Sequence, residues 1–206
     1  MLIDLLKFKL RNFWVRRMRQ RCKNRDFTLI ANNCIAGVVL HDLGVRFDTP
    51  TVNLFIKFPG YISFLKNMRQ ILECEELVEI TPPHSSLGYP VGRLGDDVVI
   101  DFLHYSTFDE AKQAWEKRKR RIHWDNLYVV LVERDGCTVD DLRAFDALEF
   151  KHKVALVHRP VEGIGCAHVM RGFEEESEVG DIFGYCGRIG HRVYDQFDWS
   201  SFLNKN

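Results

Sequence analysis

A cysteine at the start of a predicted helix is the residue whose type and position best suit covalent chemistry. The run FTLIANNCIAG predicts a strand over residues 27–31, then Asn32 and Asn33, then Cys34 in the first turn of a helix. Free backbone N–H groups and the helix dipole favour a thiolate there and lower the thiol pKa. One asparagine can cap the helix and the other can donate to an oxyanion. The alternative is that Cys34 is a small buried core residue.

A nucleophilic thiol needs a base, and His104 is the candidate. The run DVVIDFLHY predicts a strand over residues 97–105, and His104 lies at its end, just before a helix. Strand ends that lead into helices gather at one edge of a parallel sheet, so we expect His104 and Cys34 at the same edge. The alternative is a core histidine whose ring is satisfied by a backbone carbonyl.

The group that orients His104 would come from a neighbouring segment. Asp101 lies three residues before His104 in the same strand, so the alternation of side chains turns it to the other face. Asp125 and Asn126 separate a predicted helix from the strand over residues 127–132. They are therefore the candidates for this orienting role.

A second candidate site is a strongly basic helix. Thr107 with Glu110 forms a capping box that starts a helix running to residue 122, and this helix ends in KRKRR. Arg118 shares a face with the apolar residues of the helix, so its guanidinium is turned toward the body. An inward arginine suits bidentate contact with a carboxylate or phosphate, and Arg121 is a second candidate for the same contact. The alternative is compensation of the helix dipole at its C-terminus.

Other motifs for metals and nucleotides are weak or absent. The residues Cys166, His168, Cys186 and His191 have spacings that match no common zinc site, so we predict no metal. Neither G-x-G-x-x-G after a strand nor G-x-x-x-x-G-K-[ST] occurs, and G-x-S-x-G and D-x-D are missing too. The sequence indicates no particular cofactor.

The elements that would position these residues alternate between strands and helices, which predicts an α/β fold. We expect one layered domain over residues 26–206, with a mainly parallel sheet flanked by helices. Besides the strands above, the predicted elements are strands over residues 51–57 and 153–157, a helix over 61–72 and a helix after Thr138. Residues 79–95 are rich in Pro, Gly and Ser and predict a loop with at most short strands. Beyond Pro160 only a short strand over residues 166–170 is predicted.

The balanced charge of the chain, 29 basic against 29 acidic residues, hides an uneven distribution. Residues 1–25 hold nine basic residues and one acid, a net charge of +8, so the remainder carries −8. An apolar stripe is expected on a helix here, formed by Leu2, Ile3, Leu6, Leu10, Phe13 and Trp14. Such a basic amphipathic leader fits an anionic membrane surface. Docking on the domain or a partner is the alternative, and binding of nucleic acid is not expected.

The location indicated by the sequence is the cytoplasm, with peripheral association at the inner face of the membrane. The longest apolar runs are six residues, far below the roughly 18 residues needed to span a bilayer. Nothing at the N-terminus is typical of a cleavable signal. The six cysteines lie at long, uneven spacings, which favours free thiols in a reducing compartment.

Four segments together resemble a family of bacterial proteins of undetermined function that are named for exopolysaccharide or capsular polysaccharide biosynthesis. The segments are FTLIANNCIAG, DTPTVNLF, YPVGRLGDDVVIDFLHYSTFDEAKQAWEKRKRRIHWDNLYV and RAFDALEFKHKVAL. The resemblance covers roughly residues 24–200 and not the leader. It implies a role in making or decorating a surface polysaccharide, and among its shared residues Tyr105 joins Asn32, Asn33, Arg118 and Arg121 as a candidate for binding the substrate.

Three functions remain open. The first is a transferase of an acyl or related group onto a sugar, with Cys34 as nucleophile, His104 as base and a saccharide or lipid-linked saccharide as substrate. The second is a glycosyltransferase or sugar-nucleotide enzyme in which Cys34 only packs and the basic helix binds a diphosphate. The third is a non-catalytic adaptor that docks other assembly enzymes at the membrane.

Overall fold

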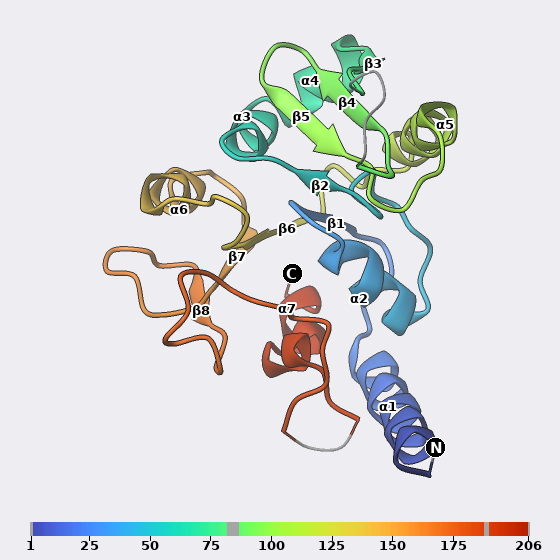
Figure 1. The fold of residues 1–206 in the computed structure, drawn as a ribbon, viewed down its shortest axis with the longest axis vertical. Coiled ribbons are helices and arrows are strands. Elements are labelled where there is room, and N and C mark those ends of the chain that lie inside the picture. The colour runs from blue at the N-terminus through green and yellow to red at the C-terminus, as the bar shows by residue number, and fades with distance from the viewer. Residues whose placement is uncertain (1, 82–86, 188–189, 206) are drawn as a thin grey trace.

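The fold was obtained as a computed structural model that describes residues 2–81, 87–187 and 190–205, with side chains described from residue 9 onward. Its elements form three layers, with a parallel sheet between two groups of helices and a second small sheet at one end (Figure 1). Within this described part, no helix has both the length and the apolar character needed to cross a bilayer.

The central sheet, sheet A, is parallel throughout. It contains β1 (Thr28–Ala31), β6 (Leu127–Val132), β7 (His152–Val157) and β8 (Ala167–Val169), in that order across the sheet. The strands β1, β6 and β7 are buried on both faces, whereas the edge strand β8 is only half-buried. Leu29 contributes to one core and Ile30 to the other, and β6 alternates in the same way. This explains why these strands are short continuous apolar runs.

Helices cover both faces of sheet A. One face carries α1 (Leu2–Arg21), α2 (Ile35–Leu43), the 3₁₀ helix η1 (Val193–Gln196) and α7 (Trp199–Leu203). The other face carries α6 (Val139–Asp146), and α5 (Phe108–Lys119) contributes to the same hydrophobic core. Side chains of Thr107 and Thr138 cap α5 and α6, as the sequence predicted. The predicted α/β fold with a mainly parallel sheet is confirmed.

A second sheet, sheet B, is antiparallel and was not predicted. Its order is β2 (Phe55–Ile56), β5 (Val98–Asp101), β4 (Val91–Leu94) and β3 (Leu77–Glu79). It packs with α3 (Gly60–Lys66) and α4 (Met68–Cys74), which replace the single helix expected over residues 61–72. The Ile56 N–H donates to the Asn32 carbonyl at 2.8 Å, which joins sheet B to the end of β1.

Most of the strand predicted over residues 51–57 is irregular, and only its end forms β2. The Thr51 hydroxyl accepts a hydrogen bond from the Ala31 N–H at 3.2 Å and also contacts the Thr49 hydroxyl at 3.0 Å. Side-chain hydroxyls therefore satisfy the free edge of β1 in place of a strand backbone.

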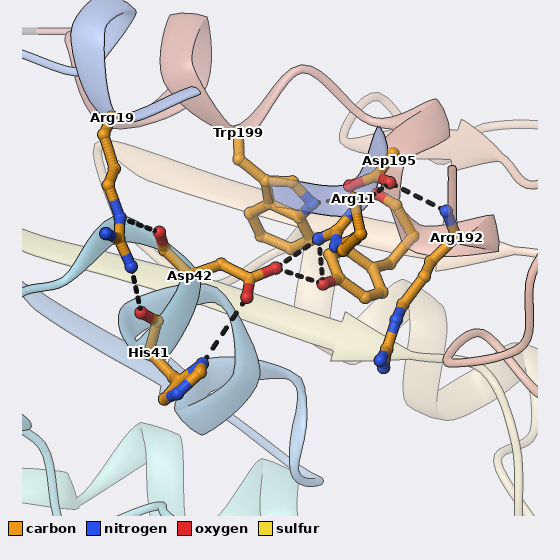
Figure 2. A network of polar contacts seen from close by, with 8 residues as sticks. Arg11, Arg19, His41, Asp42, Arg192, Asp195 and Trp199 are labelled. Atoms are coloured by element: carbon orange, nitrogen blue, oxygen red, sulfur yellow. Dashed lines mark hydrogen bonds and ion pairs between the residues drawn. The ribbon is translucent and has the colours of Figure 1, made fainter. Parts of the chain in front are cut away.

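The basic leader is docked on the domain rather than separate from it. Arg11 is buried and contacts the carboxylates of Asp42 and Asp195 and the Tyr194 hydroxyl, as Figure 2 shows for the two acids. The Arg19 guanidinium donates to the Asp42 carbonyl at 2.6 Å. These contacts hold α1 against α2 and the C-terminal segment.

The buried face of α1 differs from the predicted apolar stripe. Arg11, Val15 and Cys22 are buried, whereas Phe13 is 53% exposed. Leu2, Ile3 and Leu6 lie outside the residues with described side chains. The face is rotated because the most buried side chain within α1 is Arg11, held by the buried Asp42 and the half-buried Asp195, which a pattern of apolar residues alone does not reveal.

Candidate functional site at the carboxyl edge of the parallel sheet

The carboxyl ends of β1, β6 and β7 lead into a row of polar residues, as expected for the functional edge of an α/β sheet. Asn32 follows β1, and its side-chain amide donates to the Val132 carbonyl at 3.0 Å and accepts from the Val132 N–H at 2.8 Å. The Asn33 side chain accepts from the Ile35 N–H at 3.0 Å. Asn32 thus links two strand ends, and Asn33 hydrogen-bonds the backbone of the first residue of α2, with Cys34 as the N-cap residue between them.

Cys34 begins α2 as predicted, but its thiol is not activated by this position. The sulfur lies 3.8 Å from the Leu54 carbonyl oxygen. Burial raises the pKa of the Cys34 thiol, and the positive charge of Arg134 offsets this only in part. The direction is opposite to the one expected from the helix dipole, because the loss of hydration outweighs it.

His104 does not reach Cys34 in the structure. β5 ends at Asp101, so His104 lies beyond the strand in an exposed turn of sheet B rather than at an edge of sheet A. The predicted strand over residues 97–105 is too long by several residues. No hydrogen bond or ion pair joins Cys34 and His104 among the described residues.

Asp125 and Asn126 lie at the opposite edge of sheet A from Cys34. β1 and β6 are parallel, with Thr28 beside Leu127, so the residues before β6 flank the amino ends of both strands. The Asn126 side-chain amide donates to the Asp26 backbone carbonyl at 2.6 Å, and the Asn126 backbone carbonyl accepts a hydrogen bond from the Thr28 N–H. The parallel pairing therefore keeps Asp125 and Asn126 from orienting a base beside Cys34.

The remaining predicted residues are brought together by the end of α5. The Arg118 guanidinium donates to the Tyr105 hydroxyl at 2.5 Å and lies over the Phe47 ring, so it is turned toward the body as expected. Arg121 donates to the Phe47 carbonyl at 2.7 Å. Tyr105, Arg118 and Arg121 are thus mainly engaged with neighbouring protein groups.

At the amino edge of sheet A, one buried carboxylate contacts three basic side chains. Asp48 contacts Arg46 at 2.6 Å, Arg121 at 3.2 Å and His123 at 3.3 Å. Burial alone would raise the pKa of Asp48, but hydrogen bonds from Arg46 and His123 and the nearby arginine charges hold it below its ordinary value. The charges of this cluster are paired with one another, although the buried Nε atom of Arg121 has no hydrogen-bond partner among the described residues.

A cavity of about 510 Å³ opens between sheet B and the turn that follows β6. We call it the inter-sheet cavity. Its walls carry two ion pairs, Lys57 with Asp101 at 3.3 Å and Arg134 with Asp135 at 2.7 Å. The aromatic side chains Phe55, Phe58 and Tyr89 and the apolar Leu103 complete the lining. Its volume lies within the roughly 300–1,000 Å³ typical of small-molecule sites.

Neither half of the predicted catalytic pair belongs to the residues that line this cavity. The Cys34 sulfur contacts the carbonyl of Leu54, the residue before Phe55 of the wall, and the charge of Arg134 of the wall acts on the thiol. His104 is next in sequence to Leu103, which lines the cavity. Cys34 and His104 are thus linked to the cavity only through neighbouring residues.

Asp101 is the most unusual member of the cavity wall. The residue is 5% exposed, and its Oδ1 atom is buried without a hydrogen-bond partner among the described residues, while Oδ2 faces Lys57. A buried carboxylate oxygen without a partner is costly, so it is expected where a ligand supplies the missing donor. Asp101 therefore brings to the cavity wall a carboxylate with one unsatisfied oxygen.

A buried pair of ionisable residues adjoins the cavity. Glu133 follows β6 and His158 follows β7, and the Glu133 Oε2 atom lies 2.6 Å from Nδ1 of His158. The same oxygen accepts the His158 backbone N–H at 2.9 Å. Arg134, the residue after Glu133, lines the cavity.

Sequence reasoning missed Lys57, Asp101 as a site residue, Glu133, Arg134 and His158. One signal was available for Glu133, Arg134 and His158, since charged and histidine residues directly follow apolar strands in LYVVLVER and VALVHR. No sequence signal placed Asp101 and Lys57 beside them, because sheet B and its pairing were not predicted.

The cysteines and histidines of the C-terminal third do not assemble one site. Burial, a hydrogen bond with Asp146 and its charge raise the pKa of Cys166 to about 12. His168 and Cys186 instead line a separate cavity beside β8. Among the described residues, no three His, Cys, Asp or Glu side chains are grouped to hold a metal ion.

Comparison with known proteins gives one family and one relative. A family profile described as "Domain of unknown function (DUF1919)" matches residues 6–204. A protein from Haemophilus influenzae named "Uncharacterized protein" is 36% identical over 197 residues, covering 95% of this chain and 93% of that protein. The family match includes most of α1, so it extends further toward the N-terminus than the resemblance inferred from the four segments.

Proposed function

The chain belongs to the DUF1919 family, and we propose that it is an enzyme of surface-polysaccharide assembly. Its reaction would be the transfer of an acyl or related group onto a saccharide bound in the inter-sheet cavity. The polysaccharide role comes from the resemblance of four sequence segments to proteins of exopolysaccharide and capsule biosynthesis. The chemistry of the cavity supports a saccharide as the ligand.

Asp101 is the observation that carries the proposal. Its side chain lines the cavity, and the unpartnered Oδ1 atom can accept a hydrogen bond from a sugar hydroxyl once the carboxylate turns toward the cavity. The rings of Phe55, Phe58 and Tyr89 offer apolar surface for the C–H faces of a pyranose. The two ion pairs of the wall balance their charges, which suits a neutral sugar better than a strongly charged one.

Saccharide binding is tested with the Asp101→Asn variant against a panel of methyl glycosides, measured by ligand-observed NMR. We expect at least tenfold weaker binding by the variant, because an amide presents a different set of donors and acceptors to the hydroxyl. The matched control is Asp96→Asn, an exposed residue in the turn of the same hairpin. Equal binding by the wild type and Asp101→Asn would remove the basis of the proposal.

Cys34 is the candidate nucleophile of this transfer. In that role the thiolate attacks the carbonyl carbon of an activated acyl donor, the leaving group departs with its electron pair, and the thioester then passes the acyl group to a sugar hydroxyl. Mass spectrometry after incubation with p-nitrophenyl acetate tests for this thioester, with Cys34→Ser as control. The raised thiol pKa predicts slow acylation unless the bound substrate changes its surroundings.

A second candidate is a glycosyltransferase or sugar-nucleotide enzyme in which Cys34 only packs. The burial and raised pKa of Cys34 favour it over a covalent route. Lys57 and Arg134 would then contact the diphosphate of the donor. Thermal stabilisation by nucleotide sugars, together with no acylation of Cys34, would select this candidate over the first.

The enzyme would act at the cytoplasmic face of the membrane, where lipid-linked saccharides are built. Phe13, Arg16 and Arg17 are exposed on α1 and can meet an anionic surface while the opposite face of the helix stays docked. Flotation with vesicles containing anionic lipid tests this, with Arg16→Glu and Arg17→Glu expected to weaken binding. Unchanged flotation of the double variant would contradict it.

A further inference from the structure

The buried pair of Glu133 and His158 has no part in the function proposed so far. The Glu133 and His158 side chains are only 8% and 4% exposed. They directly follow the adjacent strands β6 and β7. Burying an acid and a histidine together has a desolvation cost that apolar residues would avoid. The pair therefore calls for a chemical explanation.

The geometry leaves one ring nitrogen of His158 available. Nδ1 lies 2.6 Å from the Glu133 carboxylate, so in the neutral ring Nδ1 carries the proton and donates it to this bond. Nε2 then holds a lone pair. It is buried and has no hydrogen-bond partner in the described part of the chain. An acid that fixes the tautomer of a histidine and leaves Nε2 basic is the arrangement that general-base catalysis uses.

A short segment, residues 178–180, is hydrogen-bonded to the backbone of Glu133 and to the cavity wall. The Val179 N–H donates to the Glu133 carbonyl at 2.8 Å, and the Arg134 guanidinium donates to the Gly180 carbonyl at 3.2 Å. The Asp135 N–H donates to the Glu178 carboxylate at 2.7 Å. Residues 178–180 therefore hold both Glu133 and the two wall residues that follow it.

We propose that His158 is the general base for the acceptor sugar, that Glu133 positions it, and that displacement of residues 178–180 opens its Nε2 atom to the inter-sheet cavity. This rests on the saccharide transfer proposed above. Nε2 takes the proton of the acceptor hydroxyl while the sugar oxygen bonds to the electrophilic carbon of the acyl group. The bond to the leaving group breaks, and its electron pair departs with that group.

The tautomer is tested without any substrate by ¹⁵N NMR of the imidazole rings in the full chain. We expect a proton on Nδ1 of His158 in the wild type and its loss from that nitrogen in Glu133→Leu, because leucine removes the acceptor. A ring protonated at Nε2, or the same tautomer in both proteins, would overturn the assignment of Glu133 and His158.

Access to His158 is tested by carbethoxylation with diethyl pyrocarbonate, followed by peptide mass spectrometry. In the wild type we expect His158 to react at least tenfold more slowly than the exposed His104, and Glu178→Ala to accelerate it severalfold. The control variant Glu176→Ala changes an exposed acid two residues before this segment and should leave the carbethoxylation rate of His158 unchanged. Equal rates in Glu178→Ala and the wild type would show that this segment does not gate the residue.

The catalytic role is tested by acyl transfer from p-nitrophenyl acetate to the methyl glycoside that binds best. His158→Gln should keep saccharide affinity and lose about 100-fold or more in transfer rate. Full transfer by His158→Gln would overturn the inference and leave the proposed function standing. Absence of transfer by the wild type would count against the proposed function, while the tautomer and labelling results would still decide the state of His158.

Discussion

The two edges of sheet A both carry buried charged side chains, but these side chains differ in whether their polar atoms have partners. At the amino edge, the buried carboxylate of Asp48 contacts two arginines and a histidine. At the carboxyl edge, Oδ1 of Asp101 and Nε2 of His158 are buried without partners in the described structure. Paired charges stabilise a fold, whereas a buried polar group without a partner costs stability, and our proposal assigns that cost at the carboxyl edge to function.

The difference follows from the direction of the chain. In an α/β layer, helices run back along the strands, so the C-terminal ends of α2 and α5 approach the amino edge. Their free carbonyls attract basic side chains, as when Arg25 donates to the Leu43 carbonyl at 3.2 Å. The carboxyl edge instead receives the turns after β1, β6 and β7, which leave room for a cavity.

The largest expected loss of stability comes from breaking a network of paired charges, the one around Arg11. Arg11→Met leaves Asp42 and Asp195 without their shared cation, and removal of one partner from a buried ion pair costs about 3–5 kcal/mol. We expect a melting temperature lower by about 10 °C in calorimetry. The exposed Arg16→Met should change stability by no more than about 0.5 kcal/mol. Similar melting of both variants would mean that the Arg11 network does not hold α1.

A smaller loss is expected from Asp48→Asn, about 2 kcal/mol at pH 7 by urea unfolding. The pKa of Asp48 is lower in the folded chain than its ordinary value, so its charge stabilises the fold above an unfolded-state pKa of about 4. This contribution is lost as the pH falls through the folded-state pKa. The gap between the wild type and Asp48→Asn should therefore close in acid, and a gap that widened would contradict the ion-pair assignment.

The smallest effect on stability is expected at the carboxyl edge. Asp101→Asn removes a buried charge whose Oδ1 has no partner and whose Oδ2 faces a half-exposed lysine, so we expect a change within about 1 kcal/mol in either direction. Urea unfolding beside Asp48→Asn gives the comparison directly. A loss as large as that of Asp48→Asn would make Asp101 a structural residue and would erase the contrast between the edges.

Local patterns in the sequence predicted the elements of sheet A well. The apolar runs before Asn32 and Glu133 became buried parallel strands, and the capping residues Thr107 and Thr138 began their helices. Cys34 lies at the helix start as expected. These features depend on residues close in sequence, so a single chain contains enough information for them.

The candidate site was harder to predict because long-range pairing decided it. Extending β5 to residue 105 placed His104 at a strand end, whereas the strand stops at Asp101. The order of strands put Asp125 and Asn126 at the opposite edge from Cys34. Burial, which only the tertiary structure shows, set the direction of the Cys34 pKa.

The sequence by itself determined an α/β chain with balanced total charge, a basic first helix and a cysteine at the turn after the first strand. Only the tertiary structure decided that this helix is docked through Arg11, that a second sheet forms one wall of a cavity, and that Asp101 and His158 lie buried near one edge. The physical reason is that periodicity and capping act over a few residues, whereas burial and pairing of polar groups depend on segments far apart in the chain.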